Sequence, residues 1–397
     1  MSRLWSWLRR DRAVSRPTGA PPRSSARTPL VPRARISFDT LEDRLAPSVS
    51  ALSQDDWRNE TFHVDDAVVA SISGPTVQAA GTNYANQSFG SLIGLDQVYA
   101  SSYHGAGYSV AVIDTGIDYT HPDLGGGWGK RVVAGWDFVN NDADPMDDNG
   151  HGTHVAGIIG SSSTSYAGVA PEANLIGLKV LGADGSGSFG AVEDALKWVI
   201  ANRTKYNIVS INLSLGSGNY NVNPYAFLDD EFAALKNAGV FIAVAAGNSY
   251  YSYQSQAGLA YPGVSPNVVS VGAVWDSNFG AVAWASGARD NSTAADRVAS
   301  FSQRSSNLSI LAPGAMITST YLGGKYQSMA GTSMASPVIA GAAAILHQAL
   351  DAAGKSNLAN EDGILSIMKS TGVRVVDGDD ENDNVVNTGL AFQRINL

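Results

Sequence analysis

Short apolar runs alternate with helical stretches from about residue 90 onward, and this alternation constrains the fold more than any other feature. Runs such as 109–113, 208–213 and 240–245 suit strands that are buried on both faces of a sheet. Amphipathic or Ala-rich stretches such as 191–202 and 333–350 are expected to be helices. Strands that alternate with helices predict an α/β fold, a doubly wound and mostly parallel sheet with helices on both faces. We also expect strands at 174–181 and 268–272 and helices at 152–160 and 226–237.

The first 50 residues differ in composition from the rest of the chain. They hold ten Arg, four acidic residues and six Pro, a charge of +6 in a chain whose net charge is −10. A segment of this kind cannot bury enough apolar surface to fold alone, so we interpret residues 1–50 as a leader. It lacks the apolar core of a secretory signal peptide. Residues 38–47 resemble the short LEPR-type N-terminal tags of some bacterial exported and surface proteins, and the alternative is a disordered tail.

Composition excludes several classes of function. The chain has no Cys, which excludes a disulfide scaffold, a thiol nucleophile and a thiolate metal site. The net charge of −10 argues against a nucleic-acid partner. No window reaches the ~18 apolar residues of a membrane span, so we expect no transmembrane segment. Residues 51–91 lack periodicity and are interpreted as a linker or a reduced N-terminal arm, followed by one domain over 92–397.

Four polar segments follow expected strands or open expected helices, where ligands of such sheets bind. They contain Asp114, His151, Asn248 and Ser333. Each residue alone has an ordinary interpretation: a strand-end turn, a metal ligand, a loop cap and a helix N-cap, respectively. Together they supply one mechanism, because a Ser nucleophile needs a His base, the base needs a carboxylate, and the oxyanion needs fixed donors.

Three long motifs then resemble those of the subtilisin-like serine peptidases, the subtilases. They are Val-Ala-Val-Ile-Asp-Thr-Gly-Ile-Asp at 110–118 with His-Pro-Asp-Leu at 121–124, Asn-Gly-His-Gly-Thr-His-Val-Ala-Gly at 149–157, and Gly-Thr-Ser-Met-Ala-Ser-Pro at 331–337. The resemblance runs from about residue 92 to the end and is strongest to the thermitase-like bacterial branch. It implies a subtilisin-like fold for this domain.

The resemblance also implies a role for each catalytic residue. Asp114 is expected to orient His151, and His151 to act first as general base and then as general acid. Ser333 is the expected nucleophile, and the Asn248 side chain with the Ser333 backbone N–H is the expected oxyanion hole. His154 is expected to be structural, and a zinc site at His151 and His154 would lack further ligands.

Substrate binding is expected to occur by backbone pairing, with an extended peptide added as a strand between two edge segments. The walls of the pocket for the P1 side chain carry no acidic residue, so an apolar P1 residue is expected rather than a basic one. Phe189 matches an aromatic residue that covers the S4 site. By resemblance, the substrate-binding residues are Gly185, Ser186, Gly187, Ser214, Leu215, Gly216, Ala245 and Ala260.

The stretch 137–148 is dense in oxygen ligands, the ligand set that calcium prefers. It resembles the calcium loop that precedes the catalytic His in thermitase-like enzymes, and the alternative is a solvated acidic turn. The implied calcium is structural, and no catalytic cofactor is expected. A second family site at Asp123 is not expected, because its partner loop at 161–167 is short and has no acid or Asn. The implied ligands are Asp137, Asn140, Asp142 and Asp144, with the Met146 carbonyl as a lesser candidate.

The sequence thus predicts a monomeric, calcium-stabilised serine endopeptidase that acts on protein or peptide substrates outside the cell or at its surface. The alternative from another class is a non-catalytic surface or binding protein that keeps the fold. Two features remain without a function: residues 51–91 are too short for the folded prodomain of many subtilases, and 276–297 has the character of an insertion.

Overall fold

The computed structural model of the protein describes residues 58–64, 66–67, 69–73, 88–378 and 380–397. The predicted leader at 1–50 lies outside the described residues. Of the predicted linker or arm at 51–91, the described part contains two strands, β1 at Thr61–His63 and β2 at Val69–Ser73, and the start of the short helix α3 at Ser88–Leu92.

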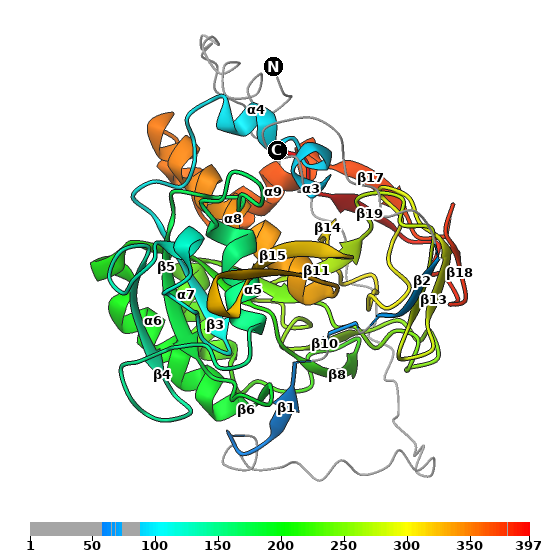
Figure 1. Cartoon of the computed structure of the whole chain (residues 1–397), viewed down its shortest axis with the longest axis horizontal. Coiled ribbons are helices and arrows are strands. Elements are labelled where there is room, and N and C mark those ends of the chain that lie inside the picture. The colour runs from blue at the N-terminus through cyan, green and yellow to red at the C-terminus, as the bar shows by residue number, and fades with distance from the viewer. Residues whose placement is uncertain (1–57, 65, 68, 74–87, 379) are drawn as a thin grey trace, which may run out of the picture.

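A nine-stranded sheet forms the centre of the protein (Figure 1). Its order is β17-β19-β14-β11-β9-β7-β3-β5-β4; every neighbouring pair from β19 to β4 is parallel, and β17 is antiparallel to β19. The predicted doubly wound, mostly parallel sheet is therefore confirmed. The strands are β3 Ser109–Asp114, β4 Val132–Asp137, β5 Asn174–Lys179, β7 Ile208–Leu213, β9 Phe241–Ala245, β11 Val269–Val274, β14 Ile310–Pro313, β17 Val373–Val376 and β19 Ala391–Arg394.

Helices cover both faces of this sheet because its central strands are apolar on both sides. In β3, Val110 and Val112 pack in one buried cluster, with side chains of α5 and α8, whereas Ala111 and Ile113 pack in a second, with side chains of α6 and α7. The helices are α5 His151–Gly160, α6 Phe189–Tyr206, α7 Asp229–Asn237, α8 Thr332–Ala352, α9 Glu361–Thr371 and α4 Leu95–Tyr99, with short 3₁₀ turns η1 Pro122–Leu124, η2 Leu322–Gly324 and η3 Ser356–Leu358.

The ends of two helices differ from the sequence expectation for local reasons. The helix expected at 226–237 begins at Asp229, where three acidic residues in the first turn favour the positive helix end. The helix expected at 191–202 is longer in both directions. Ser188 caps its N-terminus by accepting the Ala191 N–H, and Asn207 in the left-handed conformation ends it.

Among the described helices, α8 is the one whose length and mean hydropathy of 1.3 would also fit a membrane span. It corresponds to the Ala-rich helix predicted at 333–350, in which Ala, Val, Ile and Leu raise the mean hydropathy while interspersed Ser, Pro and Gly interrupt the apolar run. In the structure 94% of that window is buried inside the protein, which identifies α8 as a core helix.

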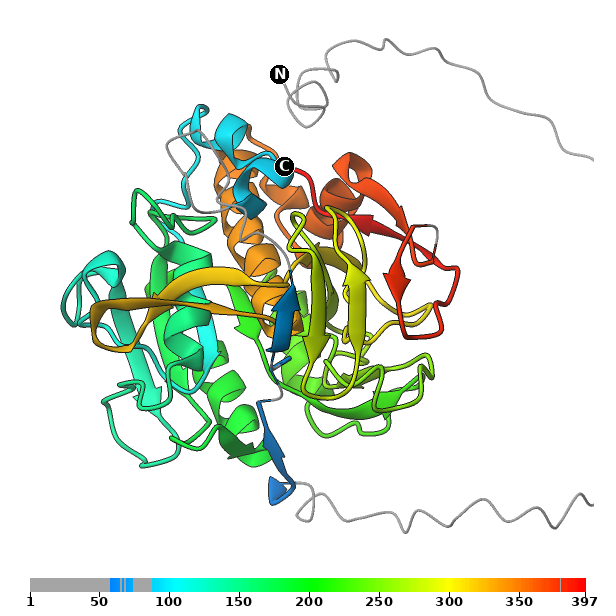
Figure 2. The same cartoon turned by 45° about the vertical axis from the view of Figure 1, so that its right-hand side comes forward.

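A smaller sheet joins three distant parts of the chain. The stretch 276–297 forms a hairpin of β12 at Ala281–Trp284 and β13 at Arg289–Ser292. The hairpin binds β2 along one edge and β18, at Asn382–Asp383 in the C-terminal tail, along the other (Figure 2). The stretch 276–297, which the sequence analysis interpreted as an insertion, therefore connects β2 of the N-terminal arm to β18 of the C-terminal tail. The remaining pairs are β1 with β6 Ser186–Ser188, β8 Ser217–Tyr220 with β10 Leu259–Tyr261, and β15 Ile317–Tyr321 with β16 Lys325–Met329.

Candidate active site

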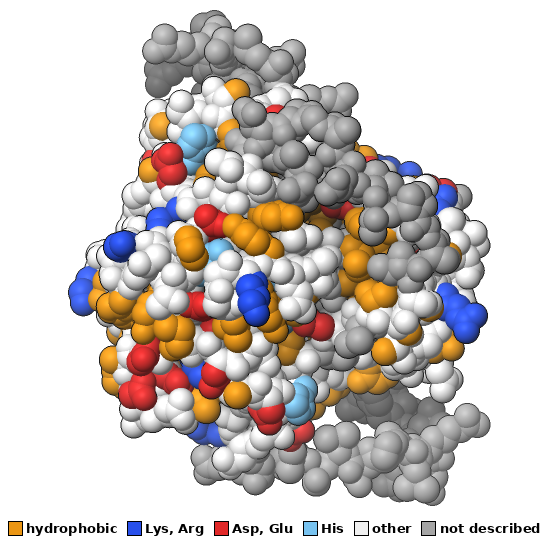
Figure 3. All heavy atoms as spheres, viewed as in Figure 1, with side chains coloured by type: hydrophobic (Ala, Val, Ile, Leu, Met, Phe, Trp, Pro, Cys, Tyr) orange, Lys and Arg blue, Asp and Glu red, His pale blue; other side chains and the backbone are white. Residues whose placement is uncertain are grey.

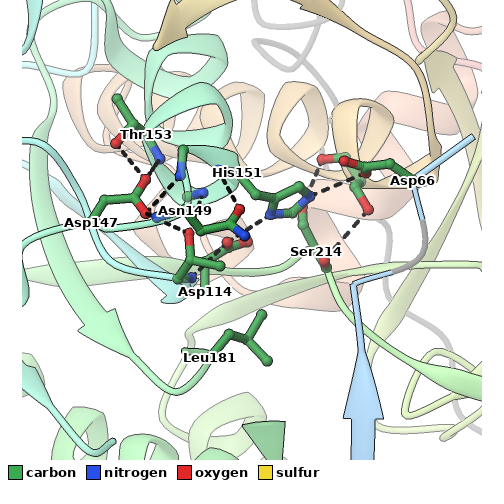
Figure 4. A network of polar contacts seen from close by, with 12 residues as sticks. Asp66, Asp114, Asp147, Asn149, His151, Thr153, Leu181 and Ser214 are labelled. Carbon is green, nitrogen blue, oxygen red and sulfur yellow. Dashed lines mark hydrogen bonds and ion pairs between the residues drawn. The ribbon is translucent and has the colours of Figure 1, made fainter. Parts of the chain in front are cut away.

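Asp114 and His151 meet at the carboxyl end of the central strand β3. Asp114 ends β3, His151 is the first residue of α5, and both side chains are buried. The distance from Asp114 Oδ1 to His151 Nδ1 is 2.7 Å (Figure 4). The same oxygen accepts the Thr115 N–H at 2.7 Å. The carboxylate therefore fixes the ring with its proton on Nδ1 and leaves Nε2 facing the cleft.

A glycine allows this close approach of helix and strand. A Cβ atom on Gly152 would lie 2.1 Å from the Gly116 carbonyl oxygen and 3.1 Å from Asp114 Oδ1. A side chain at position 152 would therefore push the start of α5 away from the end of β3, and the distance between His151 and Asp114 would increase.

Sequence reasoning missed Asp147, whose buried carboxylate organises the start of α5. One oxygen accepts Thr115 Oγ1–H at 2.9 Å and the N–H groups of Asn149 and Gly150 at 3.0 and 2.9 Å. The other oxygen accepts the N–H of Thr153 at 2.8 Å and its hydroxyl at 2.6 Å. Burial raises the pKa of Asp147, while these hydrogen bonds oppose that rise. An Asp shortly before a helix start was the available signal, because such residues cap helices.

Ser333 lies in the first turn of α8 and is 3% exposed. Its hydroxyl donates to the Ser214 carbonyl at 3.4 Å, and the Ser214 hydroxyl donates to the Ser333 carbonyl at 2.7 Å. His151 Nε2 faces a residue that the sequence analysis did not single out: Asp66 Oδ1 lies 3.3 Å away. The contact has ion-pair distance but not the alignment of a hydrogen bond.

Asn248 is oriented by Thr332, the residue before Ser333. Its Oδ1 accepts the Thr332 N–H at 2.7 Å and the Thr332 hydroxyl at 2.9 Å. A Cβ atom built on Gly331 would lie 3.2 Å from Asn248 Nδ2 and 3.5 Å from the Ser333 nitrogen. The Asn248 side-chain nitrogen and the Ser333 backbone nitrogen therefore both lie close to Gly331. Thr332 is a second residue that sequence reasoning missed.

A cavity of about 230 Å³ opens next to Ser333. Of the predicted substrate-binding residues, Leu215, Gly216, Ala245 and Ala260 line it. Gly185 directly precedes β6, which contains Ser186 and Gly187 and pairs with β1, and Ser214 contacts Ser333 directly. Among the described residues that line the cavity, none is acidic.

His154 has a different environment from His151, although both lie in α5. Its Nε2 lies 3.1 Å from the Ile317 carbonyl and 2.9 Å from the Gln327 carbonyl, so this nitrogen carries the proton. Burial lowers the pKa of His154 to about 4, so the ring is neutral near pH 7. The ring holds α5 against β15 and β16, and its Nε2 is not free to bind a metal.

The predicted calcium loop begins where β4 ends. Asp137 is buried and accepts the N–H groups of residues 139 and 140 at 2.7 and 2.8 Å, and Asn140 Nδ2 donates to its second oxygen at 2.9 Å. Asp142 accepts the Asp144 N–H at 2.9 Å, and Asp144 accepts the Tyr119 hydroxyl at 2.9 Å. Acidic side chains gather beside β4 on this face (Figure 3). In the described part of the chain, no three acidic or His side chains converge on one point as metal ligands.

Comparisons with known proteins agree with this geometry. Residues 105–387 match the Subtilase family. Subtilisin DY of Bacillus licheniformis is 38% identical over 257 residues, which are 64% of this chain and 82% of that protein. Alkaline serine exoprotease A of Vibrio alginolyticus is 35% identical over 316 residues, 79% of this chain and 51% of that protein. The crystal structure of a cold-adapted subtilisin-like serine proteinase superimposes with a TM-score of 0.53 at 33% identity, over 68% of this chain and 84% of that one. The chain therefore belongs to the subtilase family and is a serine-type endopeptidase.

Proposed function

We propose that Asp114, His151, Ser333 and Asn248 carry out the peptide hydrolysis. The Ser333 oxygen attacks the substrate carbonyl carbon while His151 Nε2 takes the hydroxyl proton. Asn248 Nδ2 and the Ser333 N–H bind the oxyanion, and Asp114 stabilises the imidazolium. His151 then protonates the leaving amine, and water hydrolyses the acyl-enzyme by the same steps. The observation that carries the proposal is the 2.7 Å contact between Asp114 and His151 beside the start of α8.

The nucleophile assignment is tested by replacing one hydroxyl. We expect Ser333→Ala to lower turnover of an unfolded protein by about six orders of magnitude and to abolish labelling by a fluorophosphonate. Ser370→Ala removes an exposed hydroxyl in α9 and serves as the matched control, with unchanged activity. Undiminished labelling of Ser333→Ala would assign the nucleophile elsewhere.

We further propose that the enzyme prefers apolar P1 residues in unfolded proteins. The support is the cavity beside Ser333, where Leu215, Ala245 and Ala260 supply apolar surface and the described lining has no carboxylate to pair with Lys or Arg. Profiling of a peptide library, with Ser333→Ala as the blank, measures the preference. A dominant preference for Lys or Arg at P1 would contradict the proposal.

We also propose that calcium stabilises this peptidase and that the chain belongs to the thermitase-like branch of the family. Carboxylate and amide oxygens of Asp137, Asn140, Asp142 and Asp144 are of the class that calcium binds. Their local hydrogen bonds would have to give way as the loop closed on the ion, since the carboxylates do not converge here. The ion would stabilise the loop that leads into His151, and no catalytic step passes through it.

We also propose that the protein is exported and acts as a monomer. A similar bacterial protein is named an exoprotease, and a chain without Cys has no thiol that an oxidising environment could alter. Fractionation of expressing bacteria tests the location, with recovery only from the cytoplasm as the contrary result. Sedimentation of the purified protein tests the oligomeric state.

A further inference from the structure

One polar side chain joins the two walls of the cavity beside Ser333. Gln303 lines this cavity and is 1% exposed. Its Nε2 donates to the Gly218 carbonyl at 3.1 Å and to Asn219 Oδ1 at 2.8 Å, both on β8. Its Oε1 accepts the Ser249 N–H, which follows β9, at 3.4 Å. The amide therefore spans the gap between β8 and the turn after β9.

Gln303 and Ala260 fill the space beside the glycines of the two walls. A Cβ atom built on Gly247 would lie 2.1 Å from Gln303 Oε1 and 2.9 Å from the Ala260 Cβ atom. A Cβ atom built on Gly216 would lie 3.1 Å from the same Ala260 methyl group. All four residues line the cavity, so the Gln303 amide and the Ala260 methyl group close it between the walls.

The backbone that carries Gln303 is fixed by its own hydrogen bond and by the next residue. The Gln303 N–H donates to the Gly247 carbonyl at 2.8 Å. The Arg304 side chain is fully buried, pairs with Asp377 in the C-terminal tail, and places its guanidinium carbon 4.2 Å from the centre of the Tyr250 ring. A substrate side chain in the cavity would therefore meet an amide that is held in place.

The chemistry of this amide limits what the cavity can receive. Both N–H groups of the Gln303 side chain are used by β8, so its oxygen is the atom that can face a substrate. An amide carries no charge, and the described residues that line the cavity include no acidic side chain. Because burial of a charge without a partner costs free energy, a substrate side chain that reaches Gln303 has to be uncharged.

From these contacts we propose that Gln303 is a specificity-determining residue, which closes the P1 pocket and sets both the length and the charge of the side chain that fits. The inference rests on the proposed function of the cavity beside Ser333 as the P1 pocket. Gln303 lies outside the segments that the sequence analysis assigned to substrate binding.

Two substitutions test the two parts of this proposal. The measurement is kcat/KM on peptides that differ only at P1, and titration of Ser333 with a fluorophosphonate counts the folded enzyme. Gln303→Ala removes the amide, so we expect the ratio of Phe to Ala at P1 to rise about tenfold or more, the effect of at least one methylene group in a pocket. Gln303→Glu adds a carboxylate, so the ratio of Lys to Leu at P1 should rise about tenfold or more, the effect of one hydrogen bond between charged groups.

The matched controls are Gln97→Ala and Gln97→Glu, which change an exposed side chain on α4 and should leave both ratios unchanged. A residue that only joined the two walls would lower kcat/KM by the same factor for every P1 residue. Wild-type ratios in both Gln303 variants would therefore overturn the inference. Gln303→Asn, an amide one methylene group shorter, replaces Gln303→Ala if that variant does not fold, with the same expected rise in the ratio of Phe to Ala. If wild type neither cleaves a peptide nor takes up fluorophosphonate, the proposed role of Ser333 falls, and the inference falls with it.

Discussion

Replacement of Asp147 by Asn tests how the start of α5 is held in place. The substitution keeps the shape of the side chain but converts one of its two acceptor oxygens into a donor. If the amide nitrogen faces Thr153, it meets that residue's N–H, which then has no acceptor. If it is turned around, it meets the N–H groups of Asn149 and Gly150 instead. Either orientation leaves at least one buried N–H without a partner.

The cost can be worked out from these bonds. One buried unsatisfied N–H costs about 1–3 kcal/mol, and each remaining bond loses the roughly 1 kcal/mol by which a charged acceptor exceeds a neutral one. Relief of the desolvation that raises the pKa of Asp147 offsets part of this loss. We expect a net loss of about 3 kcal/mol in the free energy of unfolding, which corresponds to roughly 5 °C in Tm. Because His151 starts the helix, kcat should also fall by about ten- to a hundredfold.

The free energy of unfolding is measured with denaturant in proteins that also carry Ser333→Ala, so that they cannot digest themselves. The kcat is measured by peptide hydrolysis in proteins that keep Ser333. The control is Asp96→Asn, which removes one exposed carboxylate on α4 and should change the unfolding free energy by less than about 0.5 kcal/mol. If Asp147→Asn matches wild type in both unfolding free energy and kcat, the reasoning about the Asp147 cap is wrong.

Three further predictions concern other parts of the molecule. Asn248→Ala should lower kcat about 100–1000-fold with little change in KM, and an effect on KM alone would argue against an oxyanion role. Millimolar calcium should raise the Tm of wild type but not that of the double variant Asp142→Ala/Asp144→Ala. If the wild-type melting curve is the same in chelator as in calcium, the loop at 137–146 is only a solvated acidic turn. Burial lowers the pKa of His347 to about 4, so the unfolded state binds its proton first as pH falls. Stability should therefore be lost between about pH 6.5 and 4, by about 3 kcal/mol for this residue, and His347→Gln should unfold with a correspondingly weaker pH dependence over that range.

The central sheet could be predicted from the sequence because its signals are local. Strands β3, β7 and β9 consist mostly of apolar residues and are buried along their whole length, and a distinctive polar residue ends β3 or follows β7 and β9. Asp114, His151 and Ser333 could be singled out because their types and order match a single mechanism. The family resemblance also assigned Leu215, Ala245 and Ala260 to substrate binding, and all three line the cavity.

The features that were missed depend on partners far away in the chain. Strand β1 has three residues, and nothing in Thr61–His63 identifies β6 as its partner. The hairpin at 281–292 shows its role only when β2 and β18 lie on its edges. Asp147 has five hydrogen bonds that depend on the turn geometry around α5, and Asp66 meets His151 only because the arm crosses the cleft.

The position of the hairpin along the chain has a consequence for the order of synthesis. A ribosome makes the arm first, then β6, then β12, and only afterwards Ser333. Both edges that receive the arm are thus available before the nucleophile leaves the ribosome, whereas β18, which lines the far side of the hairpin, comes last. At no stage of elongation does a nascent chain possess a complete catalytic centre without the edges on which its own arm can dock.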